Sequence, residues 1–230
     1  MLTLSIIIPC YNERETIKEI LNRIEKSNLT DGVQKEIIIV DDYSTDGTRE
    51  ILESTAEKYK IVYHQKNQGK GVAIRTGLNY VSGDYVIIQD ADLEYDPNDY
   101  QKLLDCALKN KARVVYGSRN LNSNRKNSSY LFYLGGISLT KLANILYRIK
   151  ITDEATCYKM FRTEIIKNIP LKCKRFEFCP EITAKIAKRG IQIYEEPINY
   201  EPRSKKQGKK IKVQDGIEAA WALIKYRFIN

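Results

Sequence analysis

The strongest constraint on the fold is an alternation of short apolar runs with segments whose apolar residues recur at helical spacing. The runs are rich in β-branched residues and lie at residues 5–9, 36–40, 61–64, 85–88 and 112–116. Helical patterns lie between successive runs, for example at Ile51, Leu52 and Ala56 and over residues 100–108. Over residues 1–118, this order predicts an α/β fold with a Rossmann-like, mostly parallel wound sheet and helices on both faces.

Length and composition predict one large domain over residues 1–230, because 43% of the residues are hydrophobic and can form a full core. The five cysteines are an odd number without a Cys-x-x-Cys pair, which favours neither a disulfide framework nor a zinc site. A strand pattern starts within three residues of Met1 and leaves no room for a signal-peptide core, so we expect a cytoplasmic protein. The net charge of +9 fits an anionic membrane or a phosphorylated substrate. Without a recognised binding motif, nucleic acid is not expected.

Two carboxylates one residue apart, Asp90 and Asp92, follow the run at residues 85–88, and Glu94 comes just after them. Carboxylates at the end of a buried strand are hard oxygen ligands, and this spacing predicts a Mg²⁺ or Mn²⁺ site. In a parallel sheet, the carboxyl ends of neighbouring strands lie side by side. We therefore expect residues 9–13, 41–42, 67–71 and 90–94 to converge on one cleft.

Two of these segments also have simpler interpretations. The pair Asp41 and Asp42 precedes a Ser-Thr-Asp-Gly turn, so it fits a turn or helix cap as well as a nucleotide site. The segment Gly69-Lys70-Gly71 fits an ordinary helix start, because it lacks the Gly-Lys-Ser/Thr ending of a phosphate-binding P-loop. For each segment, the residues alone do not decide between the structural interpretation and a role in a binding site.

Four ordered motifs resemble those of family 2 inverting glycosyltransferases. They are Ile8-Pro9-Cys10-Tyr11-Asn12-Glu13, Val40-Asp41-Asp42-Tyr43-Ser44-Thr45-Asp46-Gly47-Thr48, Asn67-Gln68-Gly69-Lys70-Gly71 and Gln89-Asp90-Ala91-Asp92-Leu93-Glu94. The chain most resembles the branch that contains dolichol-phosphate mannose synthase and related polyprenyl-phosphate sugar transferases. The match continues through Gly117-Ser118-Arg119, residues 152–156 and the final basic segment.

The resemblance implies a GT-A fold, a GDP- or UDP-sugar donor and a divalent metal. It assigns the base and ribose of the donor to Pro9, Tyr11, Glu13 and Asp42, with Asp41 nearby, and it puts Lys70, Gly71 and Ala91 in the same donor site. Asp90 and Asp92 would hold the diphosphate through the metal, with Asp92 as the first choice of ligand. Glu94 stands where some members carry Gln and adds a third candidate metal ligand.

Residues 119–230 are expected to form the acceptor side, and residues 1–118 the nucleotide-sugar-binding half. A mobile loop is predicted at residues 120–129, followed by an apolar stretch at 130–149 that is not expected to cross a membrane because Lys141 lies near its middle. This stretch fits packing against the core or another copy, or contact with a membrane. Residues 203–212 hold six cations and precede an amphipathic helix, whose apolar face is Ile217, Ala220, Trp221, Ile224 and Phe228. That pairing suits anionic headgroups, or else a solvated loop and a docked helix.

By resemblance, Arg119 and Arg203 bind the acceptor or donor phosphates, since an arginine fork can bond two phosphate oxygens. A phosphate acceptor is already ionised and needs no strong base, whereas a hydroxyl acceptor would need Asp153, which also fits a cap. His64 is expected to lie away from these motifs and to be structural. No serine follows Gly208, a departure from the Arg-x-x-Gly-x-Ser-Lys pattern that is common in the branch.

The sequence therefore predicts an inverting, metal-dependent transferase that moves a sugar from a nucleotide-sugar to a dolichyl or undecaprenyl phosphate, in the cytoplasm or peripherally on the cytoplasmic membrane face. One alternative keeps the donor site and uses a glycan or small-molecule hydroxyl as acceptor. A second is an inactive, transferase-like adaptor that binds membranes through its basic surface. The sugar, the nucleotide base and the oligomeric state stay open.

Overall fold

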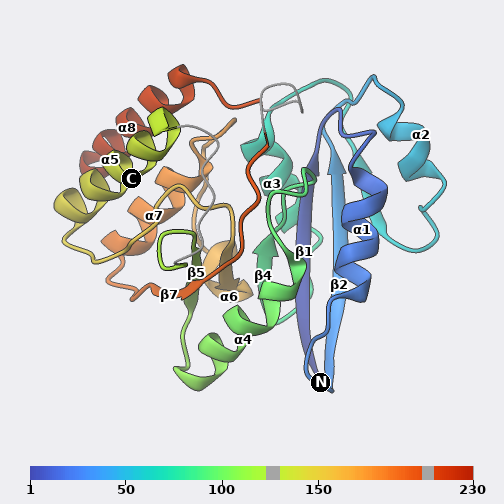
Figure 1. The fold of residues 1–230 in the computed structure, drawn as a ribbon, viewed down its shortest axis with the longest axis horizontal. Coiled ribbons are helices and arrows are strands. Elements are labelled where there is room, and N and C mark those ends of the chain that lie inside the picture. The colour runs from blue at the N-terminus through green and yellow to red at the C-terminus, as the bar shows by residue number, and fades with distance from the viewer. Residues whose placement is uncertain (123–129, 204–209, 230) are drawn as a thin grey trace.

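The computed structural model describes residues 1–122, 130–203 and 210–229, and its described strands form one seven-stranded sheet (Figure 1). The strands are β1 Leu2–Cys10, β2 Val33–Asp41, β3 Lys60–Tyr63, β4 Tyr85–Ile88, β5 Val114–Ser118, β6 Lys159–Arg162 and β7 Tyr194–Pro197. The helices are α1 Ile17–Lys26, α2 Thr48–Glu53, α3 Lys70–Leu78, α4 Tyr100–Lys109, α5 Tyr130–Tyr147, α6 Thr163–Lys167, α7 Phe178–Lys188 and α8 Val213–Phe228, with a short 3₁₀ helix η1 at Pro97–Asp99.

The strand order is β3-β2-β1-β4-β6-β5-β7, and β1 to β4 run parallel to one another. Only β6 runs antiparallel among the described strands, between β4 and β5, and β7 pairs in parallel with β5. The predicted α/β class with a mostly parallel sheet is confirmed. The register pairs Cys10 with Asp41 and Ile7 with Ile88, so the ends of β1, β2 and β4 meet at one edge.

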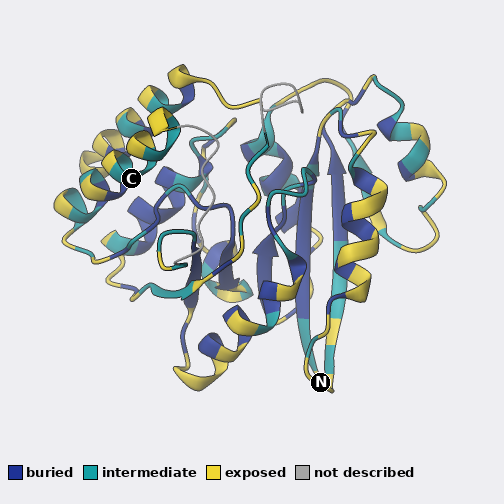
Figure 2. Cartoon of the chain, viewed as in Figure 1, coloured by how far each residue is buried: buried dark blue, intermediate teal, exposed yellow. Residues whose placement is uncertain are grey.

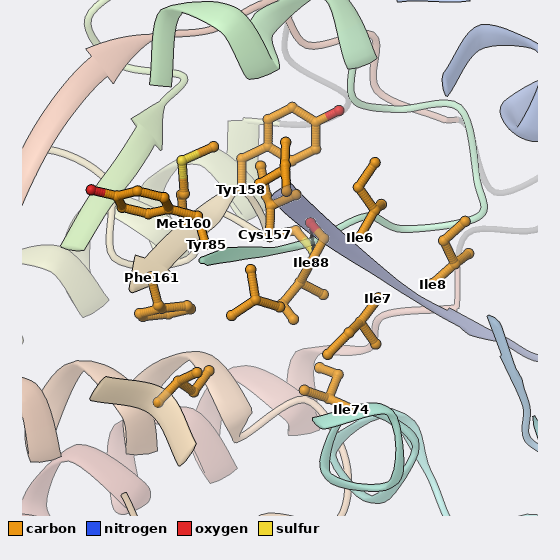
Figure 3. Packing of buried hydrophobic residues seen from close by; sticks show 14 of the residues in the cluster. Ile6, Ile7, Ile8, Ile74, Tyr85, Ile88, Cys157, Tyr158, Met160 and Phe161 are labelled. Carbon is orange, nitrogen blue, oxygen red and sulfur yellow. Dashed lines mark hydrogen bonds between the residues drawn. The ribbon is translucent and has the colours of Figure 1, made fainter. Parts of the chain in front are cut away.

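The central strands are buried on both faces, which explains their continuous apolar runs. The central strands are coloured as buried over most of their length (Figure 2). Ile6, Ile7 and Ile8 of β1 are each fully buried. Figure 3 shows Ile7 beside Ile74 of α3, and Met160 and Phe161 of β6 pointing to opposite faces of the sheet. This packing fixes the sheet and therefore the positions of the loops that leave its carboxyl edge.

Some predicted boundaries differ from the structure. The fifth strand is shifted to 114–118, so Gly117 and Ser118 belong to β5 rather than to the loop after it. Helix α2 ends at Glu53, and Ala56 lies in the turns that follow. Of the predicted loop at 120–129, residues 123–129 lie outside the described part of the chain, as do Lys205, Lys206 and Lys209 of the basic segment.

The C-terminal helix α8 packs beside α5 and α7 (Figure 1). It does so through Ala222 and Tyr226, which contact Ala184 of α7. The predicted apolar face lies outside this contact, with Ile217 and Ala220 along a cleft. Ile217, Trp221 and Phe228 on that face are 68%, 63% and 81% exposed. In the described residues we find no helix with the length and apolar character needed to span a bilayer.

Two glycines in helices test how closely α3 packs on the sheet. A Cβ on Gly77 of α3 would lie 2.7 Å from Cγ2 of Ile7, whereas Gly216 of α8 has open space around its Cα. Ile7 is fully buried and β-branched, so it has little room to move. We expect Gly77→Ala to lower the free energy of unfolding by about 1–3 kcal/mol and Gly216→Ala to raise it by about 0.5–1 kcal/mol. Urea unfolding measures both, and equal effects would contradict the close α3–β1 contact.

Candidate active site

A cleft of about 1180 Å³ opens at the carboxyl edge of the sheet. The predicted site residues along its wall are Pro9, Tyr11, Glu13, Asp42, Lys70, Asp90, Ala91, Asp92, Glu94, Arg119, Asp153 and Arg203. Asp41 and Gly71 are not among the lining residues that the structure describes. The loops after β1, β2, β3 and β4 thus meet at this edge, as their order in the sheet requires.

Three carboxylates crowd together after β4. Burial and the neighbouring carboxylates of Asp90 and Glu94 raise the pKa of the Asp92 carboxyl above its ordinary value, while Arg203 acts in the opposite direction. The Arg203 guanidinium lies 3.1 Å from Oδ2 of Asp92 and 3.1 Å from Oε2 of Glu13. One guanidinium therefore joins the loop after β4 to the loop after β1.

A second cation from the C-terminal segment reaches the same carboxylate. Nζ of Lys210 lies 2.7 Å from Oε1 of Glu13, donates to the backbone oxygens of Tyr11 and Asn12, and lies 5.6 Å from the centre of the Tyr11 ring. Glu13 is thus held by two cations that lie about 190 residues further along the chain. The sequence placed Glu13 in the donor site without these partners.

Lys70, the first residue of α3, forms an ion pair with Asp90. Burial alone would lower the pKa of the Lys70 ammonium, but the charge of Asp90 raises it above its ordinary value. The ammonium also lies 3.5 Å from the Sγ of Cys157 and 6.0 Å from the centre of the Phe176 ring. Lys70 is thus a protonated cation at the centre of the cleft.

Glu94 holds the segment that follows β7. Its carboxylate accepts hydrogen bonds from the Tyr200 hydroxyl at 2.9 Å and from the backbone N–H of Arg203 at 2.7 Å, and its carbonyl accepts from the N–H of Glu201. The chain after β7 therefore passes over the middle of the molecule on its way to α8 (Figure 1). Metal binding by Glu94 stays a prediction.

Asp41 and Asp42 have different environments although they are adjacent. Oδ2 of Asp41 lies 2.8 Å from the Arg49 guanidinium, and the side chain is fully buried outside the cleft lining. Asp42 lines the cleft, and its carboxylate accepts from the backbone N–H groups of Gln68 and Gly69 at 2.9 and 2.7 Å. Asp42 therefore caps the turn after β3 and also lines the cleft.

His64 contacts the motifs rather than lying away from them, so that prediction was wrong. Its Nδ1 lies 2.7 Å from Oδ1 of Asp42. The reason is the strand order: β3 pairs with β2, which brings the residue after β3 beside the end of β2. The third apolar run ends at His64, but the sequence does not specify which strand it pairs with.

In the second half of the chain, Asp153 forms a buried bidentate ion pair with Arg119 at the end of β5. Nε of Arg119 lies 2.7 Å from Oδ2 and its second guanidinium nitrogen lies 2.7 Å from Oδ1 of Asp153. Burial opposes ionisation of Asp153, but Arg119 outweighs it, and the pKa of the carboxyl is below its ordinary value. Glu195 supports the pair by accepting from the backbone N–H groups of Thr152 and Asp153. Both oxygens of Asp153 are thus engaged.

Glu154, the neighbour of Asp153, is a carboxyl that the sequence did not single out. It is fully buried at the cleft wall, and burial raises the pKa of its carboxyl while Lys159 acts in the opposite direction. Its carboxyl oxygens have no hydrogen bond of full geometry among the described residues, although the Thr183 hydroxyl also acts to lower the pKa of the carboxyl.

The other arm of the cleft is apolar and extends between α5 and α8. Its side chains include Leu131, Phe132, Leu139, Leu142, Phe176, Phe178, Ile217 and Ala220. Arg119, Tyr95 and Tyr200 lie where this arm meets the charged centre, with the Arg119 guanidinium 5.1 Å from the centre of the Tyr200 ring. A cationic centre therefore continues into an apolar groove.

The carboxylates fit a divalent cation by their chemistry. Asp90 and Asp92 offer hard oxygen ligands, and the crowding that raises the pKa of Asp92 is relieved by a cation. No three His, Cys, Asp or Glu side chains are already grouped as ligands within residues 1–122, 130–203 and 210–229. Cations of the protein itself now neutralise this centre, chiefly Lys70 and Arg203.

Comparisons with known proteins agree with this geometry. The profile described as Glycosyl transferase family 2 matches residues 5–169. The dolichol-phosphate mannosyltransferase of Pyrococcus furiosus is 30% identical over 89% of this chain, which spans 58% of that protein. The UDP-N-acetylglucosamine–dolichyl-phosphate N-acetylglucosaminyltransferase of Methanococcus voltae is 28% identical, and the match covers 84% of this chain and 83% of the relative.

Solved structures with the same GT-A fold include two synthases of low sequence identity. Glucosyl-3-phosphoglycerate synthase from Mycobacterium tuberculosis, in complex with Mn²⁺, UDP and phosphoglyceric acid, superposes with a TM-score of 0.71 at 18% identity, covering 100% of this chain and 80% of that one. Mannosyl-3-phosphoglycerate synthase from Rubrobacter xylanophilus gives 0.73 at 19% identity, covering 98% and 72%.

The Arg119–Asp153 pair predicts a large coupling free energy. Arg119→Met would leave a buried carboxylate without its cation, and we expect a loss of about 3–5 kcal/mol in the free energy of unfolding. The double variant Arg119→Met/Asp153→Leu should lose less than the sum of the two single variants. Arg162→Met is the control, because the Arg162 guanidinium has an exposed pair with Glu164 at 3.7 Å and a ring contact with Tyr85 at 5.9 Å, so its loss should cost less than about 1 kcal/mol. Additive losses in urea unfolding would refute the coupling.

Proposed function

Because the chain belongs to glycosyl transferase family 2, we propose that it transfers a hexose from a nucleotide-sugar to a polyprenyl phosphate with inversion at the anomeric carbon. The observation that carries the acceptor class is the continuity of a cationic centre with an apolar groove between α5 and α8. A lipid phosphate has one anionic end and a hydrocarbon chain, and these two surfaces match it. The names of the dolichyl- and undecaprenyl-phosphate transferases among its relatives support the same class.

The donor is proposed to lie along residues 1–118 and the acceptor along residues 119–230. Pro9, Tyr11 and Asp42 would line the base and ribose, and Asp90 and Asp92 would hold a Mg²⁺ or Mn²⁺ ion at the diphosphate. A bound divalent cation neutralises the negative charge that develops on the diphosphate leaving group. Lys70 would add a second positive charge there, since its ammonium already lies at Asp90.

In the transfer, an oxygen of the acceptor phosphate forms a bond to the anomeric carbon as the bond to the donor diphosphate breaks. The electron pair of the broken bond leaves with the nucleoside diphosphate. Arg119 would orient the acceptor phosphate, because Asp153 and Tyr200 fix its guanidinium. The acceptor is already ionised near neutral pH, so no base is required.

A hydroxyl acceptor is favoured less by the same contacts. The predicted base Asp153 has both oxygens bonded to Arg119 and a lowered pKa, which makes it a weak base. Glu154 is fully buried, so an acceptor would reach it only after a movement of its loop. In this proposal Asp153 is a positioning residue for Arg119.

We further propose that the outer surface of α5 and α8 lies against an anionic membrane, so that the lipid enters the groove from the bilayer. Leu131, Leu134 and Ile145 of α5 are exposed, as are Ile217, Trp221 and Phe228 of α8. Cationic residues on the same helices, such as Lys141 and Lys225, are also exposed. Exposed apolar side chains next to cations suit the headgroup region of a bilayer.

The reaction is tested with UDP- and GDP-hexoses, Mg²⁺ or Mn²⁺, and two matched acceptors, a polyprenyl phosphate and the corresponding polyprenol. The parent should use the phosphate and not the alcohol. Asp92→Asn should lower the rate by about 100-fold or more with little change in circular dichroism. Asp105→Asn, an exposed carboxylate on α4, is the control and should leave the rate unchanged. Transfer to the alcohol, or an Asp92→Asn rate within a few-fold of the parent, would contradict the proposal.

Membrane contact is tested by co-sedimentation with vesicles of phosphatidylcholine, alone or with about one third phosphatidylglycerol. Binding should rise with the anionic lipid and fall with added salt, which shortens the Debye length from about 10 Å at 0.1 M to about 3 Å at 1 M. Trp221→Gln/Phe228→Gln should weaken binding to both kinds of vesicle. Leu108→Gln, an equally apolar exposed position on α4, should not. Equal recovery of all three proteins in every condition would exclude the membrane surface.

A further inference from the structure

His64 is buried between the donor end of the cleft and helix α3. Its Nδ1 lies 2.7 Å from Oδ1 of Asp42, and its Nε2 lies 3.0 Å from Oγ1 of Thr76. Its backbone is also fixed, because its N–H donates to the carbonyl of Asp41 and its carbonyl accepts from Arg49. The imidazole therefore has one well-defined position, with a polar partner on each ring nitrogen.

The contacts of this imidazole connect α3 to the wall of the cleft. A carboxylate oxygen accepts hydrogen bonds, so Nδ1 of His64 is placed to donate to Oδ1 of Asp42. Nε2 and the Thr76 hydroxyl form the second hydrogen bond, in which the donor depends on the tautomer of the ring. Thr76, His64 and Asp42 therefore form one continuous hydrogen-bonded series.

Asp42, which His64 contacts, also binds the loop after β3. Its carboxylate accepts from the N–H groups of Gln68 and Gly69 at 2.9 and 2.7 Å, and its carbonyl accepts from the side chain of Asn67 at 3.3 Å. Asp42, Asn67, Gln68 and Gly69 all line the donor end of the cleft. Asp42 therefore holds three successive residues of the wall, Gln68 and Gly69 through its carboxylate and Asn67 through its carbonyl.

The opposite side of the loop is held by a backbone contact. Gly69 has φ +95°, and a Cβ at this position would lie 2.4 Å from the carbonyl oxygen of Lys174. That same oxygen accepts from the N–H of Val72 at 3.2 Å. The loop at residues 67–69 is therefore held from two sides, by Asp42 and by the close approach of Lys174.

We propose that His64 is a positioning residue for the nucleoside diphosphate part of the donor, acting through Asp42 on the loop at residues 67–69. The proposal rests on the proposed function for the identity of the ligand. It assigns His64 no contact with substrate. A residue that merely filled space would support stability without changing the loop or the affinity for nucleotide.

A matched pair of variants separates the two roles. Asn is close to Leu in size and shape but keeps an N–H donor near the place of Nδ1, so His64→Asn preserves the bond to Asp42 and His64→Leu removes it. Hydrogen exchange is measured in the ligand-free proteins at the amides of Gln68 and Gly69, with the core amides of β2 reporting global opening. Affinity is measured for UDP and GDP with Mn²⁺.

In His64→Leu, the Gln68 and Gly69 amides should exchange at least about 10-fold faster relative to the β2 amides, and the dissociation constant of the bound nucleotide should rise about 10- to 100-fold, the effect of one hydrogen bond to a charged group. His64→Asn should stay within a few-fold of the parent in both. Equal exchange and affinity in the two variants would overturn the proposal, as would faster exchange with unchanged affinity. A parent protein that binds neither nucleotide would instead contradict the proposed function, and the exchange result would still decide whether His64 holds the loop.

Discussion

The arrangement of the molecule depends on the crowding of carboxylates at one edge of its sheet. Parallel strands β1 and β4 end beside each other, so Glu13, Asp90 and Asp92 share a cleft in which their side chains are only 9%, 18% and 15% exposed. A cluster of partly buried, ionised carboxylates is stable only when cations lie close to it. Lys70 supplies one from α3, and Arg203 and Lys210 supply two from the C-terminal segment. These ion pairs connect the C-terminal segment to the loops after β1 and β4.

This dependence explains why the chain crosses the cleft after β7. Glu94 fixes Tyr200 and the backbone of Arg203, which puts the Arg203 guanidinium between Glu13 and Asp92. The same carboxylates are those proposed to bind the metal and the donor. Binding would then exchange one set of positive charges for another, so the Arg203 guanidinium would be released from Asp92 toward the phosphates, for which its planar fork is suited.

The sequence predicted the parallel half of the fold well because its signal is local. The run at 85–88 matches β4 at both ends, and the convergence of four loops follows from strand direction alone. The antiparallel strand β6 was not predicted: it is four residues long and includes Lys159, which is buried under the Tyr116 ring. The contacts of these side chains were also not predictable. His64 reaches Asp42 because β3 pairs with β2, and Arg49 reaches Asp41 because of the path of the chain between β2 and α2. The sequence thus predicted which residues belong to the site. It could not predict which side chains each of them contacts, because those contacts form only in the folded structure.

The most direct test of this charge exchange is a structure of the protein determined with Mn²⁺ and the nucleoside diphosphate that it binds. We expect a carboxylate oxygen of Asp92 to lie at bonding distance from the ion, about 2.0–2.3 Å. The Arg203 guanidinium, now 3.1 Å from Asp92, should have left that carboxylate. A structure in which the ion and nucleotide are bound while Arg203 still bridges Glu13 and Asp92 would contradict the exchange.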